Sequence, residues 1–354
     1  MTNAATAKLL DMLKIDLPII QAPMAGVSSP AMAAAVAEAG GLGSIGIGAS
    51  SVDAAARMLT EVRARTGRPF NVNVFAHQPA RADAALEAAW IERLRPRFAE
   101  YGAAPPPALR EIYTSFVEDD AMLALLVEQR PAIVSFHFGL PEPRRIRALR
   151  EAGVLLFASA TSLAEARQAA EAGVDAIVAQ GYEAGGHRGV FNPDAPDDRL
   201  GTLALTRLLV SALDLPIIAA GGIMDGAGIR AALSLGAAAA QLGTAFVATD
   251  ESLADEGYRA AMFSEAAHHT VMTRAISGRP ARCLANRFTA FGAGVSSSNI
   301  PAYPIAYDLG KALHGAARGA AESGYGAQWA GQGAPLARRM AAGLLTRRLA
   351  EEIR

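Results

Sequence analysis

Short apolar runs alternate along the chain with longer segments of helical character. The run LPIIQA at 17–22 is rich in β-branched residues, and PAMAAAVAEAG at 30–40 opens with proline and closes with glycine. This order predicts one strand followed by one helix. Seven further apolar runs predict strands of the same kind, at 42–47, 70–75, 132–138, 154–160, 175–180, 216–221 and 238–243.

The predicted strands are apolar along their whole length. Such strands are expected where helices cover both faces of a parallel sheet, and helix-length segments such as 162–173 lie between them. Eight strand–helix units ending near residue 243 favour an α/β fold of the (β/α)₈ or TIM barrel type. An open doubly wound sheet is the alternative, but its glycine fingerprint belongs in the first turn, and the cluster LGSIGIGAS at 42–50 comes later.

Two segments are additional to the eight strand–helix units of a minimal barrel. Residues 76–130 hold more than one helix, interrupted by the turn-rich YGAAPPP at 101–107, and predict a helical insertion over the rim. The second segment, 251–354, has a loop-like stretch followed by helical sequence. We therefore expect residues 1–250 to form the barrel with its insertion, and 251–354 to form a C-terminal helical cap.

Composition narrows the class of partner. The 354 residues are 51% hydrophobic, and 33 basic residues balance 34 acidic ones for a net charge of -1, so nothing indicates nucleic acid or anionic membrane binding. A small-molecule partner is predicted. The single cysteine, Cys283, excludes an internal disulfide and favours a reducing compartment. No apolar run reaches the roughly 20 residues that span a bilayer, so a cytoplasmic location is predicted.

Glycine-rich strand ends carry the first candidate chemistry. TIM barrels commonly hold a phosphate in the loops after strands seven and eight, where this chain has AGGI at 220–223 and QLGT at 241–244. Backbone N–H groups and the Thr244 hydroxyl can donate to phosphate oxygens. The alternative is that these glycines only form tight turns.

Amide side chains near two other strand ends suit a heteroaromatic ligand. Asn73 and Gln180 can both donate and accept, as the polar edge of a flavin ring requires, although Asn73 would also serve as a loop cap. Met24 in APMAG would lie beside such a ring, or in the core.

These motifs resemble one family. QAPMAGVSSPAMAAAVAEAGGLG, NVNVF, SFHFGLP, AQGYEAGGHRG, AAGGI, QLGTAF, and YPI followed by WAGQ look like nitronate monooxygenases, formerly called 2-nitropropane dioxygenases, and the HFG, GGHRG and WAGQ segments look like the bacterial class I type. The resemblance runs from about residue 17 to 333. It implies FMN as the cofactor. The FMN-binding residues it implies are Asn73, Gln180, Gly185, Gly222, Gln241, Leu242, Gly243 and Thr244.

The resemblance also implies an activity. In this family a nitronate passes single electrons to the flavin, and O₂ completes oxidation to a carbonyl compound and nitrite; the substrates are alkyl nitronates or carboxylated ones such as propionate 3-nitronate. Our hypothesis places His187 over the flavin in contact with the nitronate, with His137 as a second polar contact or a satisfied rim residue. A histidine can also remove the α-proton of a neutral nitroalkane, and the sequence leaves both roles open.

A tyrosine and lysine pattern predicts the substrate pocket. Tyr303, Tyr307 and Lys311 recur at i, i+4 and i+8, which would place them on one helix face that meets a carboxylate. The resemblance adds Tyr113 and Tyr258. A solvated amphipathic helix is the alternative. No HxH or HExxH spacing occurs, so no metal is predicted.

Two other function classes stay open. An NAD(P)H-dependent flavin reductase, of the quinone or enoyl-thioester type, would use the same barrel and phosphate loops, although HFG and WAGQ argue against it. A non-catalytic flavin-binding protein would need the loops but not His187. The C-terminal helices also offer apolar surface for a homodimer.

Overall fold

A barrel of eight parallel strands forms the body of the molecule. The computed structural model describes residues 3–353. The strands follow the order β1-β9-β8-β6-β5-β4-β3-β2, and a parallel bridge between Ile20 and Leu42 closes the ring. They are β1 (Ile19–Gln21), β2 (Gly43–Gly46), β3 (Phe70–Phe75), β4 (Ile133–His137), β5 (Leu155–Ala160), β6 (Ala176–Gln180), β8 (Ile217–Ala220) and β9 (Ala239–Leu242). Each predicted run contains one strand, and the predicted TIM barrel is confirmed.

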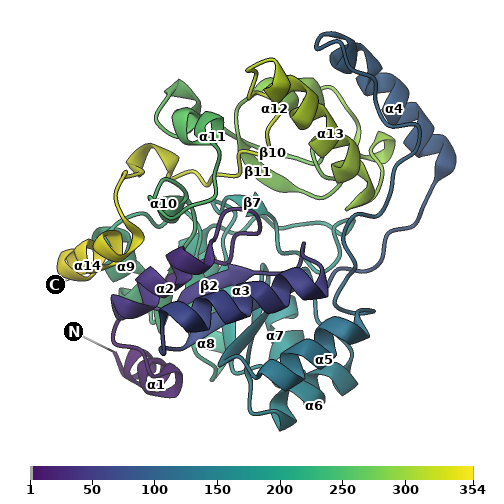
Figure 1. The fold of residues 1–354 in the computed structure, drawn as a ribbon. Coiled ribbons are helices and arrows are strands. Elements are labelled where there is room, and N and C mark those ends of the chain that lie inside the picture. Colours follow the sequence, from purple (N-terminus) through teal and green to yellow (C-terminus); the bar gives the residue numbers. More distant parts are fainter. Residues whose placement is uncertain (1–2, 354) are drawn as a thin grey trace.

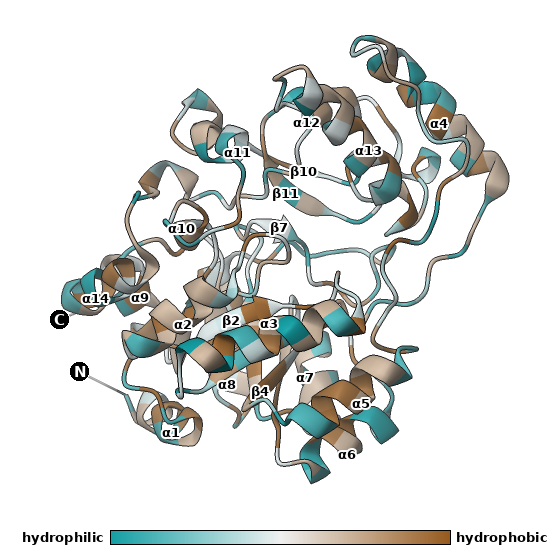
Figure 2. Cartoon of the chain, viewed as in Figure 1, coloured by the Kyte–Doolittle hydropathy of each residue, from teal (hydrophilic) through white to brown (hydrophobic). Residues whose placement is uncertain are grey.

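Eight helices surround the barrel, one after each strand. They begin where capping residues stand: Ser29, Ser51 and Ser162 each accept a hydrogen bond from a backbone N–H of the first turn. Figure 2 shows brown, apolar residues on the strands behind α3, whose outward turns carry teal, polar residues. The ring consists of α2 (Pro30–Glu38), α3 (Val52–Arg65), α5 (Asp120–Gln129), α6 (Pro143–Glu151), α7 (Leu163–Glu171), α8 (Thr202–Ala212), α9 (Gly226–Ser234) and α14 (Ala342–Ile353).

The last helix departs from the predicted cap. α14 packs against both α2 and α9 on the barrel wall, beside α9 in Figure 1, and Leu345 and Leu349 join the apolar cluster of Val36 and Ile229. The division at residue 250 stays a prediction, but the segment that follows it does not all lie over the rim, because α14 completes the helix ring.

A cap covers the carboxyl ends of the strands. α4 (Ala84–Ala99), from the predicted insertion, packs against α13 (Ile305–Gly319), and Trp90, Leu94 and Leu313 lie in one apolar cluster. The cap also holds a three-stranded antiparallel sheet that the sequence analysis does not anticipate: β10 (Thr270–Thr273), β11 (Ala281–Leu284) and β7 (Gly186–His187). The shorter elements are α10 (Thr244–Val247), α11 (Glu256–Ala261), α12 (Arg287–Gly292) and the 3₁₀ turns Glu265–His268, Ser297–Asn299 and Ala334–Leu336.

The opposite end of the barrel is plugged. Helix α1 (Ala4–Leu13) places Leu9 and Leu13 against Phe157 and Ile218, which fill the barrel interior. The strands' carboxyl ends are therefore the end left for a ligand. Among the described helices, none has the length and apolar composition needed to cross a bilayer.

The plug gives a stability prediction. Leu9 is fully buried, so Leu9→Ala should leave a cavity and lower the free energy of unfolding by about 2 to 5 kcal/mol. Urea unfolding would measure this change, with Lys8→Ala on the exposed face of the same helix as the control. Equal stability of the two variants would contradict the assigned role of α1.

Candidate active site

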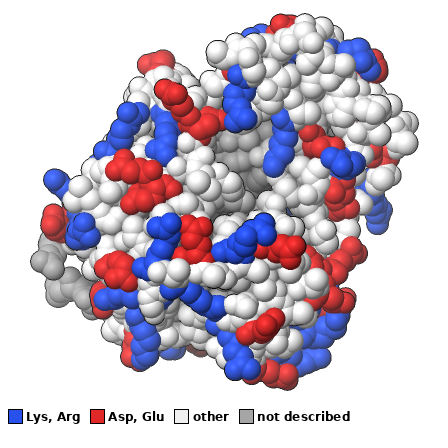
Figure 3. Space-filling view, viewed as in Figure 1, with Lys and Arg blue, Asp and Glu red and all other residues white. Residues whose placement is uncertain are grey.

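A cavity of about 520 Å³ lies between the barrel rim and the cap. This volume is in the range of small-molecule and cofactor sites. Figure 3 shows the hollow between the two halves of the molecule, and acidic and basic side chains mixed over the surrounding face. The cavity thus opens at the end of the barrel where the sequence predicts ligand-binding groups.

Almost all predicted site residues line this cavity. They are Met24, Asn73, Tyr113, His137, Gln180, Gly185, His187, Gly222, Gln241, Gly243, Thr244, Tyr258, Tyr303, Tyr307 and Lys311. Leu242 is the exception. Successive side chains of a strand point to opposite faces, so Gln241 faces the cavity while Leu242 is buried among the barrel helices. Leu242 can therefore offer a ligand only its backbone.

One end of the cavity is built from backbone. Gly221 and Gly222 have φ values of +125° and +69°, which favour glycine, and Gly243 lines the same cavity. Thr244 Oγ1 accepts a hydrogen bond from Gly331 N at 2.9 Å, so its own proton is free to donate. These groups can hold a phosphate, as the sequence predicts.

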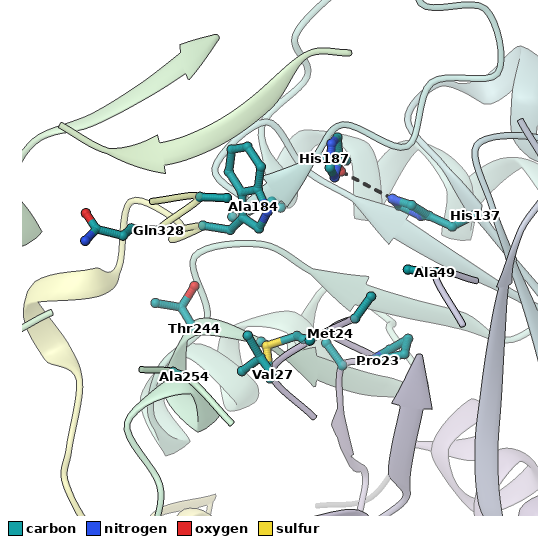
Figure 4. Close-up of a pocket in the computed structure, with 18 of the residues that line it drawn as sticks. Pro23, Met24, Val27, Ala49, His137, Ala184, His187, Thr244, Ala254 and Gln328 are labelled. Carbon is teal, nitrogen blue, oxygen red and sulfur yellow. Dashed lines mark hydrogen bonds between the residues drawn. The ribbon is translucent and has the colours of Figure 1, made fainter. Parts of the chain in front are cut away.

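The loop that carries His187 is fixed by its backbone. The carbonyl oxygen of His187 accepts hydrogen bonds from Gln180 Nε2 at 3.0 Å and from His137 Nε2 at 3.3 Å, the latter drawn in Figure 4. Gln180 Oε1 accepts from Gly189 N at 2.7 Å. Both ends of the Gln180 amide thus bind the loop, a structural task that the sequence analysis does not assign to it.

A buried ion pair supports the same loop. Arg188 is almost fully buried and donates from Nε and Nη2 to the Asp197 carboxylate at 2.8 and 3.0 Å, and from Nη1 to Gln180 O at 2.5 Å. The paired geometry holds the loop in one conformation. No pattern in the sequence points to Arg188, since only the fold brings Asp197 beside it.

The His187 ring lies in an aromatic enclosure. Its centroid is 5.1 Å from that of Trp329, 5.2 Å from Tyr303 and 5.5 Å from Phe138, and its Nε2 lies 2.8 Å from Ser277 Oγ. Burial lowers the pKa of His187 well below its ordinary value, and the charge of Arg279 lowers it further. His187 is therefore neutral near pH 7.

His137 uses both ring nitrogens within the protein. A carbonyl only accepts, so Nε2 must carry the hydrogen that it donates to His187 O, and Nδ1 then accepts from Ser159 Oγ at 2.9 Å. Burial lowers the pKa of His137 to about 4. The arrangement fits the rim-residue alternative, and direct contact between His137 and substrate stays a prediction.

The tyrosine and lysine cluster differs from prediction in one detail. Helix α13 begins at Ile305, so Tyr303 precedes it, because Pro304 disfavours helical geometry at the residue before it. Tyr303 nevertheless faces the same cavity as Tyr307 and Lys311. The solvated-helix alternative is wrong for the two tyrosines, which line the cavity.

Lys311 stands partly exposed at the cavity mouth. Its Nζ lies 5.0 Å from the centroid of the Tyr113 ring and 5.3 Å from that of Tyr307, close enough for cation–π attraction. Partial burial lowers the pKa of Lys311. A cation held between rings, with no carboxylate within salt-bridge distance among residues 3–353, is suited to an anion entering the cavity.

Comparison with known proteins identifies the family. A family model described as nitronate monooxygenase matches residues 6–352. The chain belongs to the nitronate monooxygenase family. It is 62% identical to a nitronate monooxygenase of Paraburkholderia phytofirmans over 98% of this chain and 94% of the relative. A nitronate monooxygenase of Pseudomonas aeruginosa is 52% identical over 99% of each chain.

A solved structure supports the same placement. A nitroalkane oxidase from Streptomyces ansochromogenes superposes with a TM-score of 0.87 and 42% sequence identity, over 98% of this chain and 97% of that one. The resemblance stated from the motifs is thereby confirmed, and the chain is an enzyme of an oxidoreductase family.

Several groups around the site have no signal in the sequence. His77 is buried between Phe138 and Tyr303, and neither ring nitrogen has a partner among residues 3–353. The guanidinium of Arg279 lies over the Phe138 ring, 4.3 Å from its centroid. In the same described range, no three His, Cys, Asp or Glu side chains gather as metal ligands do; the absence of a metal stays a prediction.

His77 generates a prediction on pH and stability. Burial, with a contribution from Arg279, lowers the pKa of His77 from 6.5 to about 4. The unfolded chain therefore binds an extra proton at this residue between these pH values, and the contribution of His77 to the free energy of unfolding should fall by about 3 kcal/mol as the pH falls from 6.5 to 4.

Urea unfolding at pH 7 and pH 5 measures about 2 kcal/mol of this loss, because the remainder occurs below pH 5. His77→Phe keeps the ring packing and removes the titrating group, so its stability should fall less than that of the wild-type protein over the same interval. The same decrease in both proteins would contradict the assignment to His77.

Proposed function

We propose that the enzyme uses FMN to oxidise nitronates with O₂, yielding a carbonyl compound and nitrite. The family membership supports nitronates as the substrate class. The observation that carries the proposal is the neutral His187 ring, which faces a cavity lined by a phosphate-suited cradle and by Lys311. Alkyl and carboxylated nitronates both belong to this class.

The cavity fits FMN at two points. Gly222, Gly243 and Thr244 would hold the phosphate through backbone N–H groups and one hydroxyl. Figure 4 shows Met24 on one side of the cavity and His187 on the other, which suits a planar ring between them. When bound, FMN supplies an acceptor for electrons from the substrate and a donor for O₂.

The chain's own residues would bind and shield the substrate. Tyr303, Tyr307 and Trp329 surround His187 with aromatic rings, which exclude water from the reacting carbon. Lys311 would pair with the charge of the nitronate or of its carboxylate. Burial of the substrate among these rings strengthens that pairing.

Anaerobic mixing of the FMN-loaded enzyme with propionate 3-nitronate tests the proposal. The absorbance of oxidised flavin should fall rapidly, and admission of O₂ should restore it while nitrite appears. NADH in the same buffer should leave the absorbance unchanged. Loss of absorbance with NADH alone would establish the reductase alternative instead.

A matched variant separates catalysis from cofactor binding. His187→Asn should retain FMN, since the ring's hydrogen bond in the described chain goes to Ser277 and not to the phosphate cradle, but lose about 100-fold or more in oxidation of a neutral nitroalkane, whose α-proton a histidine can remove. Retention of both FMN and full activity would favour a non-catalytic role for this site. The cytoplasmic location and the homodimer stay predictions.

Lys311 provides a prediction on substrate choice. Lys311→Met keeps the length of the side chain and removes its charge, so KM for propionate 3-nitronate should rise about tenfold, as expected for loss of one charged hydrogen bond. KM for an alkyl nitronate of the same chain length should change by about twofold or less. Steady-state oxygen consumption measures both, and equal effects would contradict a carboxylate contact.

A further inference from the structure

Ser277 joins His187 to the backbone of the cap. It is completely buried in the turn that connects β10 and β11, where Ser277 N and Gly278 N donate to Arg274 O. Its Oγ lies 2.8 Å from His187 Nε2, 3.2 Å from Arg279 O and 3.4 Å from Arg279 N. One hydroxyl thus meets three groups, and its single proton decides how they pair.

The backbone partners fix where that proton goes. Arg279 O can only accept, and among residues 3–353 it has no donor other than Ser277 Oγ. Arg279 N–H can only donate to the same oxygen. When the Ser277 proton goes to Arg279 O, Oγ accepts from Arg279 N and from a hydrogen on His187 Nε2, and every group is satisfied. If the Ser277 proton went to His187 Nε2 instead, the buried carbonyl of Arg279 would have no hydrogen-bond donor.

We infer that Ser277 holds neutral His187 in the tautomer with hydrogen on Nε2, so that the Nδ1 lone pair faces the cavity. Nδ1 has no hydrogen-bond partner within residues 3–353. The atom is not fully buried, and the ring that carries it lines the cavity. Ser277 is a positioning residue in this account, because it acts through the ring.

The tautomer determines what His187 offers a substrate. A bare lone pair accepts a proton and gives none to an anion, so it matches a neutral nitroalkane. The α-carbon C–H bond would break, its proton would pass to Nδ1, and the electron pair would delocalise onto the nitro oxygens. The product is a nitronate, so this inference rests on the proposed function, which consumes that product in the same cavity.

Nearby charge keeps the lone pair available. The Arg279 guanidinium lies over the Phe138 ring, which in turn meets His187 edge-on. Burial and this cation both disfavour protonation of His187 and so lower its pKa. His187 is therefore unprotonated before a substrate enters.

Nitrogen-15 NMR of the FMN-loaded, histidine-labelled enzyme tests the tautomer directly. The His187 signals are those that His187→Asn lacks. The wild-type spectrum should show hydrogen on Nε2 and none on Nδ1, and Ser277→Ala should lose this preference. Ser159→Ala removes the hydroxyl beside His137 Nδ1 and should leave the His187 signals unchanged. Hydrogen on Nδ1 in the wild-type enzyme, or an unaltered tautomer in Ser277→Ala, would overturn the inference.

Kinetics test the consequence for substrate class. In Ser277→Ala, kcat/KM for a neutral nitroalkane should fall about tenfold or more, as for a misplaced general base, while kcat/KM for preformed nitronate should change about twofold or less. Ser277→Thr keeps the hydroxyl and should restore kcat/KM for the neutral nitroalkane. Equal losses on both substrates would overturn the inference. Failure of the wild-type enzyme to oxidise nitronate would instead refute the proposed function, while the NMR result would still decide the tautomer.

Discussion

The tie between the barrel rim and the cap is the constraint on which the site depends. Strand β7 belongs to the loop after β6, yet it pairs with β11 of the C-terminal segment. Beside it, a side chain at Gly185 would place its Cβ 2.4 Å from Gly331 N, so two backbones meet there without side chains. Through this contact the barrel supplies the loop that carries His187, and the cap supplies the groups that surround its ring.

The protonation states of the histidines in the aromatic enclosure depend on burial more than on ion pairs. His77, His137 and His187 are all held neutral, and Arg279 lies close enough to lower the pKa of each. Arg188 has Asp197 as its partner, whereas no carboxylate lies within salt-bridge distance of Arg279 in the described chain. A positive potential beside neutral rings suits a site in which negative charge develops on a substrate.

The sequence patterns predicted the barrel because each strand is a separate apolar run followed by a helix. They also placed Asn73, Gln180, His187 and Thr244 at one rim, because parallel strands end on the same side. They did not predict the sheet of β7, β10 and β11. Strand β7 is only two residues long, lies within a glycine-rich loop and gives no periodic signal. Ser277 was missed for a related reason. It lies 90 positions from His187, and only the β7–β11 pairing brings them together.

The place of α14 has a consequence for how the molecule assembles. The helix that completes the ring beside α2 comes from residues 342–353, after the whole cap has been passed. Topologically the C-terminal part of the cap, from β10 to α13, is an insertion within the last strand–helix unit of the barrel. During synthesis on the ribosome, the first helices must wait with an uncovered apolar face until the final turns emerge. The helix ring can therefore close only after the cap residues that precede α14 have been synthesised, and its half-built form is the state most exposed to aggregation and chaperone capture.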